Sequence, residues 1–206
     1  EEFMKKVLLT TAAALAISSS AFADMDQFYL RGDLGVAKFD KVKFASNSHK
    51  TKFNTFGLDV GVGTNVMDNT RAELVYNHVF ANNFKHTNGA FNSKVKPGAQ
   101  ALMLRGLVDF ADLGAGKLFA GVGLGWAKTS AKYSDSLNRS VKAKAKNNLA
   151  WSAHLGCGFD LADGVKADVA YSVRDYGKTK EATIGAAKSK ASFRAYNLSA
   201  GVRFDI

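Results

Sequence analysis

The stretch HLGCGFDLADGVKADVAYSVRDYG, residues 154–177, decides the fold class of this 206-residue chain. Its apolar residues, such as Leu155, Cys157 and Phe159, occupy alternate positions, which is the period of a β-strand. The alternation stops at the short Ala162-Asp163-Gly164 segment and then resumes. The stretch therefore predicts a β-hairpin made of two amphipathic strands.

The same alternation occurs eight times along the chain. The apolar runs lie at about residues 28–36, 56–65, 71–80, 102–110, 118–126, 149–160, 165–174 and 196–206. Short turns at 67–69, 111–116 and 162–164 alternate with longer polar segments at 40–52, 82–98, 128–147 and 177–190. This pattern predicts an all-β fold: an eight-stranded antiparallel transmembrane β-barrel with short periplasmic turns and long extracellular loops.

A soluble β-sandwich also shows alternating strands, so the composition of the two faces has to distinguish them. Here the polar face combines both signs of charge with many glycines, which suits a narrow, filled interior. The apolar face carries Trp, Tyr and Phe near the strand ends, as expected at a lipid boundary. These features favour the membrane barrel.

The charged residues of the polar face are expected to fill the barrel as ion pairs, because eight strands leave little interior space. A pore lining remains the alternative. The expected interior charges are Arg31, Asp33, Asp59, Arg71, Glu73, Arg105, Asp109, Asp160, Lys166, Asp168, Arg174, Arg203 and Asp205.

The N-terminal residues have the pattern of a secretory signal peptide, predicted at 4–23. Lys5 and Lys6 precede an apolar run, Val7 to Ile17, and Ala21-Phe22-Ala23 has the form of a cleavage site. The barrel domain is then residues 24–206. Export makes a nucleic-acid partner improbable in spite of the net charge of +10.

Cysteine and histidine are too few and too scattered to suggest a structural metal site. A single cysteine excludes an internal disulfide, and the four histidines have no metal-ligand spacing. We expect no cofactor and no catalytic site. Ser152 and His154 share a strand face about 7 Å apart, which leaves a lipid A modifying enzyme as a weak alternative.

Three segments resemble the bacterial opacity-type family of small outer-membrane barrels, which are surface antigens with porin-like folds. They are LFAGVGLGWA (118–127), the opening stretch and AYNLSAGVRFDI (195–206). Tyr171, Asp175, Tyr176 and Gly177 match the segment that ends the seventh strand in this family. The resemblance implies a bacterial outer-membrane location and contact with the insertion machinery, although Ile206 replaces the usual terminal aromatic residue.

The four long segments are all basic, and together they carry more net positive charge than the whole chain. The Lys-Ala repeat at 141–146 could also be an amphipathic extension of the adjacent strand. We therefore expect a surface antigen or adhesin whose loops contact anions, either lipopolysaccharide phosphates or host-surface glycans; a small porin-like channel is the alternative. The loop cations are Lys41, Lys43, Lys50, Lys52, Lys85, Lys94, Lys96, Lys128, Lys132, Arg139, Lys142, Lys144, Lys146, Lys178, Lys180, Lys188 and Lys190.

Overall fold

The computed structural model describes residues 28–39, 53–80, 84–88, 91–135, 140–178, 182–184, 187–189 and 192–206. The proposed signal peptide and the segment 40–52 lie outside these residues. The strands are β1 (Phe28–Phe39), β2 (Phe53–Met67), β3 (Thr70–Val79), β4 (Phe84–Asn88), β5 (Phe91–Asp112), β6 (Lys117–Asp135), β7 (Ser140–Ala162), β8 (Val165–Lys178), β9 (Ala182–Ile184), β10 (Ala187–Ser189) and β11 (Ser192–Asp205).

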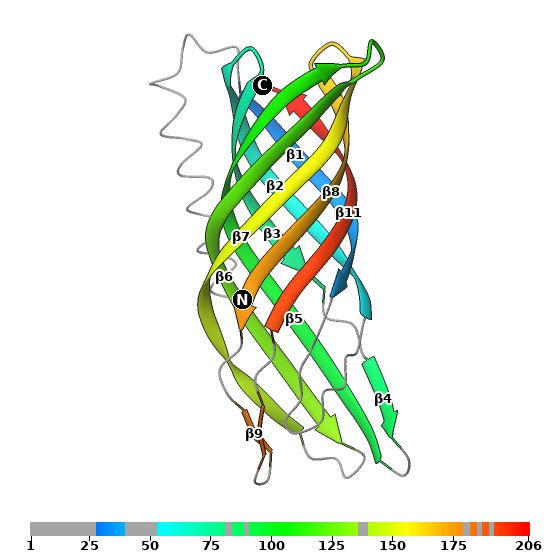
Figure 1. The fold of residues 1–206 in the computed structure, drawn as a ribbon, viewed down its shortest axis with the longest axis vertical. Coiled ribbons are helices and arrows are strands. Elements are labelled where there is room, and N and C mark those ends of the chain that lie inside the picture. Colours follow the sequence, from blue (N-terminus) through cyan, green and yellow to red (C-terminus); the bar gives the residue numbers. More distant parts are fainter. Residues whose placement is uncertain are drawn as a thin grey trace.

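Eight of these strands close into an antiparallel barrel (Figure 1). The sheet runs β3-β2-β1-β11-β8-β7-β6-β5, and pairing between β3 and β5 completes the ring. The first barrel strand, β1, pairs with the last, β11, from Tyr29 opposite Asp205 to Phe39 opposite Ala195. The prediction of an eight-stranded antiparallel barrel is confirmed.

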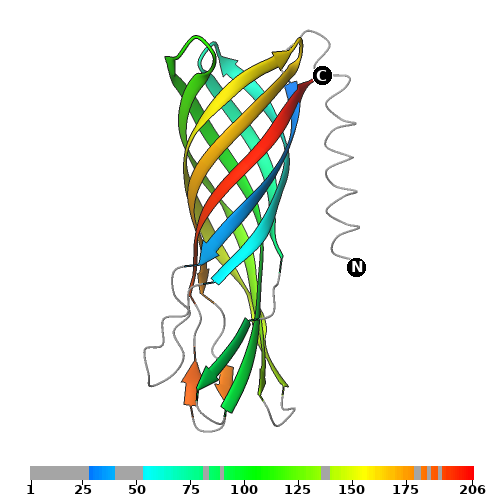
Figure 2. The same ribbon diagram turned by 90° about the vertical axis from the view of Figure 1, so that its right-hand side faces the viewer.

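The long segments predicted as loops contain more strand than expected. Strand β4 lies inside 82–98, while β9 and β10 form a separate two-stranded sheet inside 177–190. Strands β5, β6 and β7 are 22, 19 and 23 residues long, although about 9–11 residues suffice to cross a membrane. They continue well beyond the other barrel strands, with β4 alongside β5 (Figures 1 and 2).

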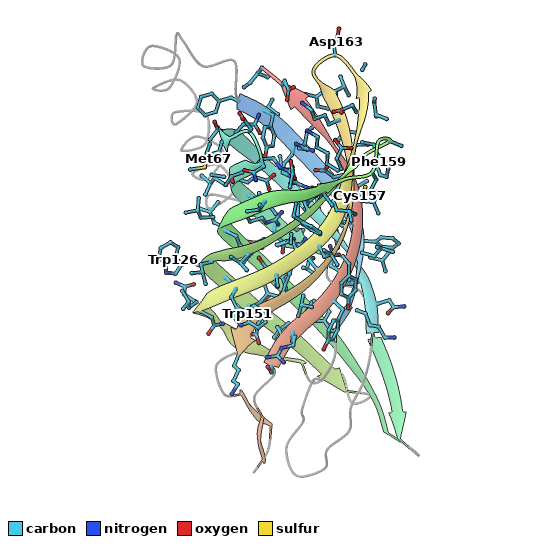
Figure 3. The ribbon with its side chains drawn as sticks, turned by 45° about the horizontal axis from the view of Figure 1, so that its top comes forward. Met67, Trp126, Trp151, Cys157, Phe159 and Asp163 are labelled. Atoms are coloured by element: carbon cyan, nitrogen blue, oxygen red, sulfur yellow. The ribbon has the colours of Figure 1, made fainter. Side chains whose placement is uncertain are left out.

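The outer surface of the barrel is apolar because the alternating residues place their side chains on it. Trp126 is 72% exposed, and Trp151 also points outward (Figure 3). Phe159 and Met67 lie on this surface near the opposite end. Exposed aromatic side chains near both ends of an apolar band are typical of proteins that cross a membrane as barrels. Within the described part of the chain, no helix has the length and apolar character needed to span a membrane.

Candidate functional site

The middle of the barrel interior is organised around Asp59 on β2. Its carboxylate accepts two hydrogen bonds from Arg174, Nη1 to Oδ1 at 2.9 Å and Nη2 to Oδ2 at 2.8 Å. Arg105 donates a third hydrogen bond to Oδ2 at 2.6 Å, and Asn77 donates to Oδ1. All four side chains are buried. One carboxylate thus joins β2, β3, β5 and β8, and two guanidinium groups compensate for its loss of hydration.

A second cluster lies nearer the periplasmic end, around Arg31 on β1. Its guanidinium group donates to both oxygens of Glu73, at 2.6 and 2.7 Å, and to both oxygens of Asp33, at 2.9 and 2.6 Å. The hydroxyl group of Tyr29 donates to Glu73 at 2.7 Å. These groups are also buried, so the cluster joins β1 to β3 across the intervening strand β2 as a set of paired charges.

The pairing continues to the periplasmic mouth but becomes solvent-exposed there. Arg203 donates to Asp168 at 2.9 Å inside the barrel, and Arg71 donates to Asp109 at 2.8 Å. At the rim, Lys166 donates to Asp205 at 2.8 Å, with side chains that are 31% and 36% exposed.

The expected interior charges therefore fall into three groups. Asp160 and Asp205 are exposed at the rim, so their assignment to the interior was wrong: the strands run past the end of the packed lumen at these positions. Asp109 and Lys166 are half-buried. The buried charges are Arg31, Asp33, Asp59, Arg71, Glu73, Arg105, Asp168, Arg174 and Arg203. With Asp109 they contain equal numbers of arginines and carboxylates.

Glycine provides the space for these large side chains. A Cβ atom at Gly158 would lie 2.8 Å from Oδ1 of Asp168 and 3.0 Å from Nη2 of Arg203. At Gly123 it would lie 2.6 Å from Oγ of Ser152. The glycines of the polar face thus allow large polar and charged side chains to lie close against the barrel wall.

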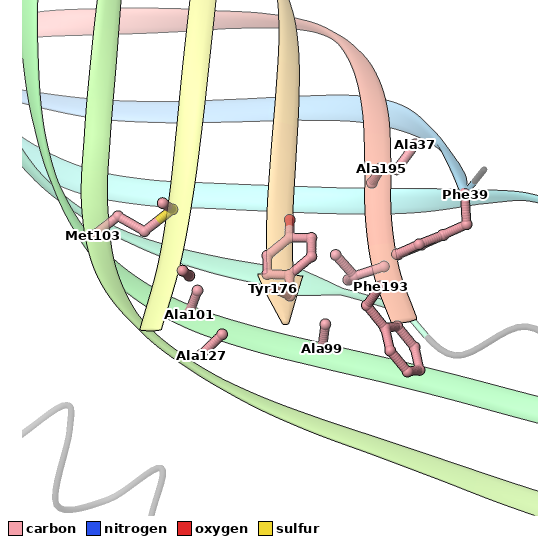
Figure 4. Close-up of a cluster of buried hydrophobic side chains, with 11 residues drawn as sticks. Ala37, Phe39, Ala99, Ala101, Met103, Ala127, Tyr176, Phe193 and Ala195 are labelled. Carbon is pink, nitrogen blue, oxygen red and sulfur yellow. The ribbon is translucent and has the colours of Figure 1, made fainter. Parts of the chain in front are cut away.

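The extracellular half of the interior contains a cluster of apolar side chains, which sequence analysis missed. Phe39 packs edge-on against Phe193, with ring centroids 5.8 Å apart, and its centroid lies 6.4 Å from that of Tyr176 (Figure 4). The sequence analysis expected ion pairs to fill the barrel and did not predict this apolar part. Several members are alanines, which suit either face and gave no clear signal. The apolar cluster comprises Ala37, Phe39, Val79, Ala99, Ala101, Met103, Ala127, Ala150, Tyr176, Phe193 and Ala195.

Tyr176 connects this apolar cluster with the charges below it. Its hydroxyl group donates a 2.6 Å hydrogen bond to Oδ1 of Asn77, which also donates to Asp59. Asp175 faces the other way, accepts from Arg194 at 3.0 Å and accepts the Gly177 amide at 2.8 Å. Gly177 has a φ of +81°, a conformation that glycine adopts without strain. Residues 171–177, which resemble the opacity-type family, thus connect the packed interior with the end of β8.

Ser152 and His154 are joined by a hydrogen bond, with Oγ and Nε2 2.9 Å apart. The sequence predicted about 7 Å between their backbone positions, but the side chains turn toward each other. Both are buried inside the barrel. Because they face the lumen, they do not present a nucleophile to the surrounding lipid, as a lipid A hydrolase would require.

The described part of the chain contains no group of three or more His, Cys, Asp or Glu residues placed to hold a metal ion. Cys157 is half-buried and has a free thiol.

The loop cations are concentrated where the barrel projects beyond the membrane. We name residues 84–88, 91–98, 128–135 and 140–147, which belong to β4, β5, β6 and β7, the extracellular extension. It contains Lys85, Lys94, Lys96, Lys128, Lys132, Lys142, Lys144 and Lys146. The Lys-Ala repeat therefore continues β7, as the strand-extension interpretation proposed.

The remaining predicted loop cations are elsewhere. Lys178 ends β8 and is exposed, and Lys188 lies in β10. Those outside the described residues are Lys41, Lys43, Lys50, Lys52, Arg139, Lys180 and Lys190.

Proteins of similar sequence occur in Rickettsia. One from Rickettsia conorii, provisionally named an adhesin, is 35% identical over 251 residues, covering 98% of this chain and 100% of the relative. Another from Rickettsia bellii, with the same provisional name, is 36% identical over 229 residues, with the same shares covered.

Solved structures share the fold at lower sequence identity. Neisserial surface protein A is 18% identical, with a TM-score of 0.55, covering 87% of this chain and 97% of that structure. Ail, the attachment invasion locus protein of Yersinia pestis, was solved with the heparin analogue sucrose octasulfate. It is 16% identical, with a TM-score of 0.51, covering 86% of this chain and 99% of that structure.

The family assignment agrees with the geometry of the barrel. Residues 9–204 match the model of the outer membrane protein beta-barrel domain, a range that includes every barrel strand except the last residue of β11. This protein therefore belongs to the family of outer membrane β-barrel domain proteins of bacteria.

Proposed function

We propose that this protein is a non-catalytic, adhesin-like surface protein whose basic extracellular end contacts anionic molecules. The observation that carries the proposal is the extracellular extension, a projecting sheet rich in lysine and poor in carboxylates. A concentrated positive charge outside the membrane attracts anions and accelerates their encounter. The relatives provisionally named adhesins and the Ail complex with a heparin analogue support this direction.

The partners proposed are of two kinds. Lipopolysaccharide and the insertion machinery accompany the barrel in its own membrane, after removal of residues 4–23 as a signal peptide. Anionic glycans or proteins on a host surface are the partners of the basic end.

A porin-like channel is the competing function, and two observations weigh against it. The apolar cluster lies in the extracellular half of the lumen, and the charges below it are paired with one another. Planar-bilayer recordings of the full chain are expected to show no stable conductance. Reproducible ion-selective steps would instead support the channel.

Adhesion is tested by displaying the full chain on a non-adherent bacterium and counting attachment to cultured host cells. We expect attachment to fall as salt rises, because exposed charges are screened within about 8 Å at physiological ionic strength. A variant with Gln at every loop cation should attach no better than cells without the protein. Undiminished attachment by that variant, with surface display verified, would refute the proposal.

A further inference from the structure

The strand register of the extracellular extension places lysines directly opposite one another on neighbouring strands. Lys96 on β5 pairs with Lys132 on β6, and Lys132 pairs with Lys142 on β7. Two residues further from the membrane, Lys94 on β5 pairs with Lys85 on β4. We name these five residues the lysine ladder.

Directly paired residues lie on the same face of a sheet, so the ladder occupies one face. Counting by two along β6 from the outward-facing Trp126 leads through the exposed Lys128 to Lys132. The register of β5 with β6 is uninterrupted from Gln100 to Ser93, so the alternation is preserved there. The ladder is therefore on the continuation of the barrel's outer face.

The other face of the extension carries an apolar row, which explains how the sheet can tolerate the ladder. Phe84, Val95, Tyr133 and Val141 form one row across all four strands. Like charges directly opposite each other destabilise a sheet, whereas aromatic and β-branched pairs stabilise it. One face thus favours the sheet, while the other concentrates positive charge.

Carboxylates are absent from the ladder face of the extension. Its single acidic residue, Asp135, pairs with Ser93 and lies on the opposite face by alternation. A register shift between Thr129 and Ala131 places Lys146 opposite Thr129, which is buried in the interior. The shift therefore prevents the lysines of the Lys-Ala repeat (141–146) from forming a continuous row along β7. The ladder instead runs across neighbouring strands.

We propose that the lysine ladder is the binding site for a linear polysulfated glycan, an inference that rests on the adhesin function proposed above. Three lysines in one row span two interstrand spacings, about 10 Å, and the next row lies about 7 Å further along the strands. A chain bearing several sulfates matches such a grid, because each sulfate can approach more than one ammonium group. Ser134 and Ser140 continue the Lys94 row and add hydroxyl groups suited to sugars.

The height of the ladder favours a ligand outside the membrane over lipopolysaccharide phosphates. Lys132 lies six residues beyond Trp126, about 20 Å along the strand. The aromatic boundary marks the level of the lipid headgroups. The ladder therefore stands above that level, where a glycan of another cell can reach it.

The test uses the full chain refolded in bilayers that contain no lipopolysaccharide, with an immobilised heparin oligosaccharide as the probe. The ladder variant carries K96Q, K132Q and K142Q. The matched control carries K41Q, K43Q and K50Q, which remove the same charge from segment 40–52. We expect the ladder variant to bind about tenfold more weakly, because it loses three ammonium groups from one site, whereas the control should remain within about threefold of wild type.

A K132E variant separates binding from structure. Its carboxylate would lie between Lys96 and Lys142, which should strengthen strand pairing and preserve resistance to limited proteolysis, yet reduce heparin binding further.

Equal losses in the ladder variant and the control would overturn the ladder, because they indicate a net-charge effect, but would leave adhesion intact. If the heparin probe does not bind but host-cell attachment still depends on the loop cations, the ladder is again overturned and the adhesin function stands. The adhesin proposal itself is refuted only if host-cell attachment persists after all the loop cations are neutralised. Preferential binding of lipopolysaccharide vesicles over heparin, lost in the ladder variant, would also overturn the assignment to a sulfated glycan.

Discussion

Arg174 and Asp59 are 115 residues apart in the sequence and meet inside the barrel through two parallel hydrogen bonds. The planar guanidinium group matches the carboxylate, so the pair fixes the relative positions of β8 and β2 across the lumen. Arg105 binds the same carboxylate from β5. Asp59 therefore balances two buried cations, so the loss of its charge should be costly.

Asp59→Asn should reduce the free energy of unfolding by about 3–5 kcal/mol, because both arginines would lose their buried counter-charge. Urea unfolding in lipid vesicles, followed by heat-modifiable gel mobility, measures this loss. Asp205→Asn is the control, since its exposed pair with Lys166 contributes at most about 1 kcal/mol. Similar losses in the two variants would contradict the central role of Asp59.

Tyr176→Phe should cost about 1–3 kcal/mol, because it leaves the buried Asn77 oxygen without its hydroxyl donor while preserving the ring. Tyr171→Phe removes a hydroxyl group from the outer face, where the side chain is 49% exposed, and should have little effect. The same unfolding assay compares them. If both changes are neutral, the hydrogen bond from Tyr176 does not contribute to stability.

The barrel could be predicted from the sequence because the outer face leaves a strong signal. Leu155, Trp151 and Leu198 repeat at period two and face outward as expected. Arg31 and Glu73 alternate with such residues, so their interior position also followed. Their specific pairing did not, because it depends on how far neighbouring strands are shifted relative to each other.

The apolar cluster in the lumen could not be predicted with the same reasoning. Ala99, Ala101 and Ala127 are small, and their hydrophobicity is too weak to identify a face. Met103 is an apolar residue on the interior side of β5, and it belongs to the cluster. The lysine ladder was hidden for another reason: Lys96, Lys132 and Lys142 come from three strands and align only through the register.

Phe39→Ala should destabilise the barrel by about 3–5 kcal/mol, as expected for removing a buried phenyl ring from a packed cluster. Phe39 is 2% exposed and contacts Phe193 edge-on. Phe56→Ala removes a ring that faces outward and is 63% exposed, so lipid can fill the space and the loss should be smaller. Equal losses would indicate that the cluster is not packed as a core.

Gly158→Ala should cost about 1–3 kcal/mol, because the added methyl group would press against the paired Asp168 and Arg203. Gly106→Ala is the matched control: a Cβ atom at Gly106 meets nothing within 4 Å, and the residue lies on the exposed outer face. That substitution should be neutral or stabilise by up to about 1 kcal/mol, since alanine restricts the unfolded chain. A cost at Gly158 without a cost at Gly106 would show that the interior glycines make room for the charge network, whereas equal costs would point to a general loss of backbone freedom.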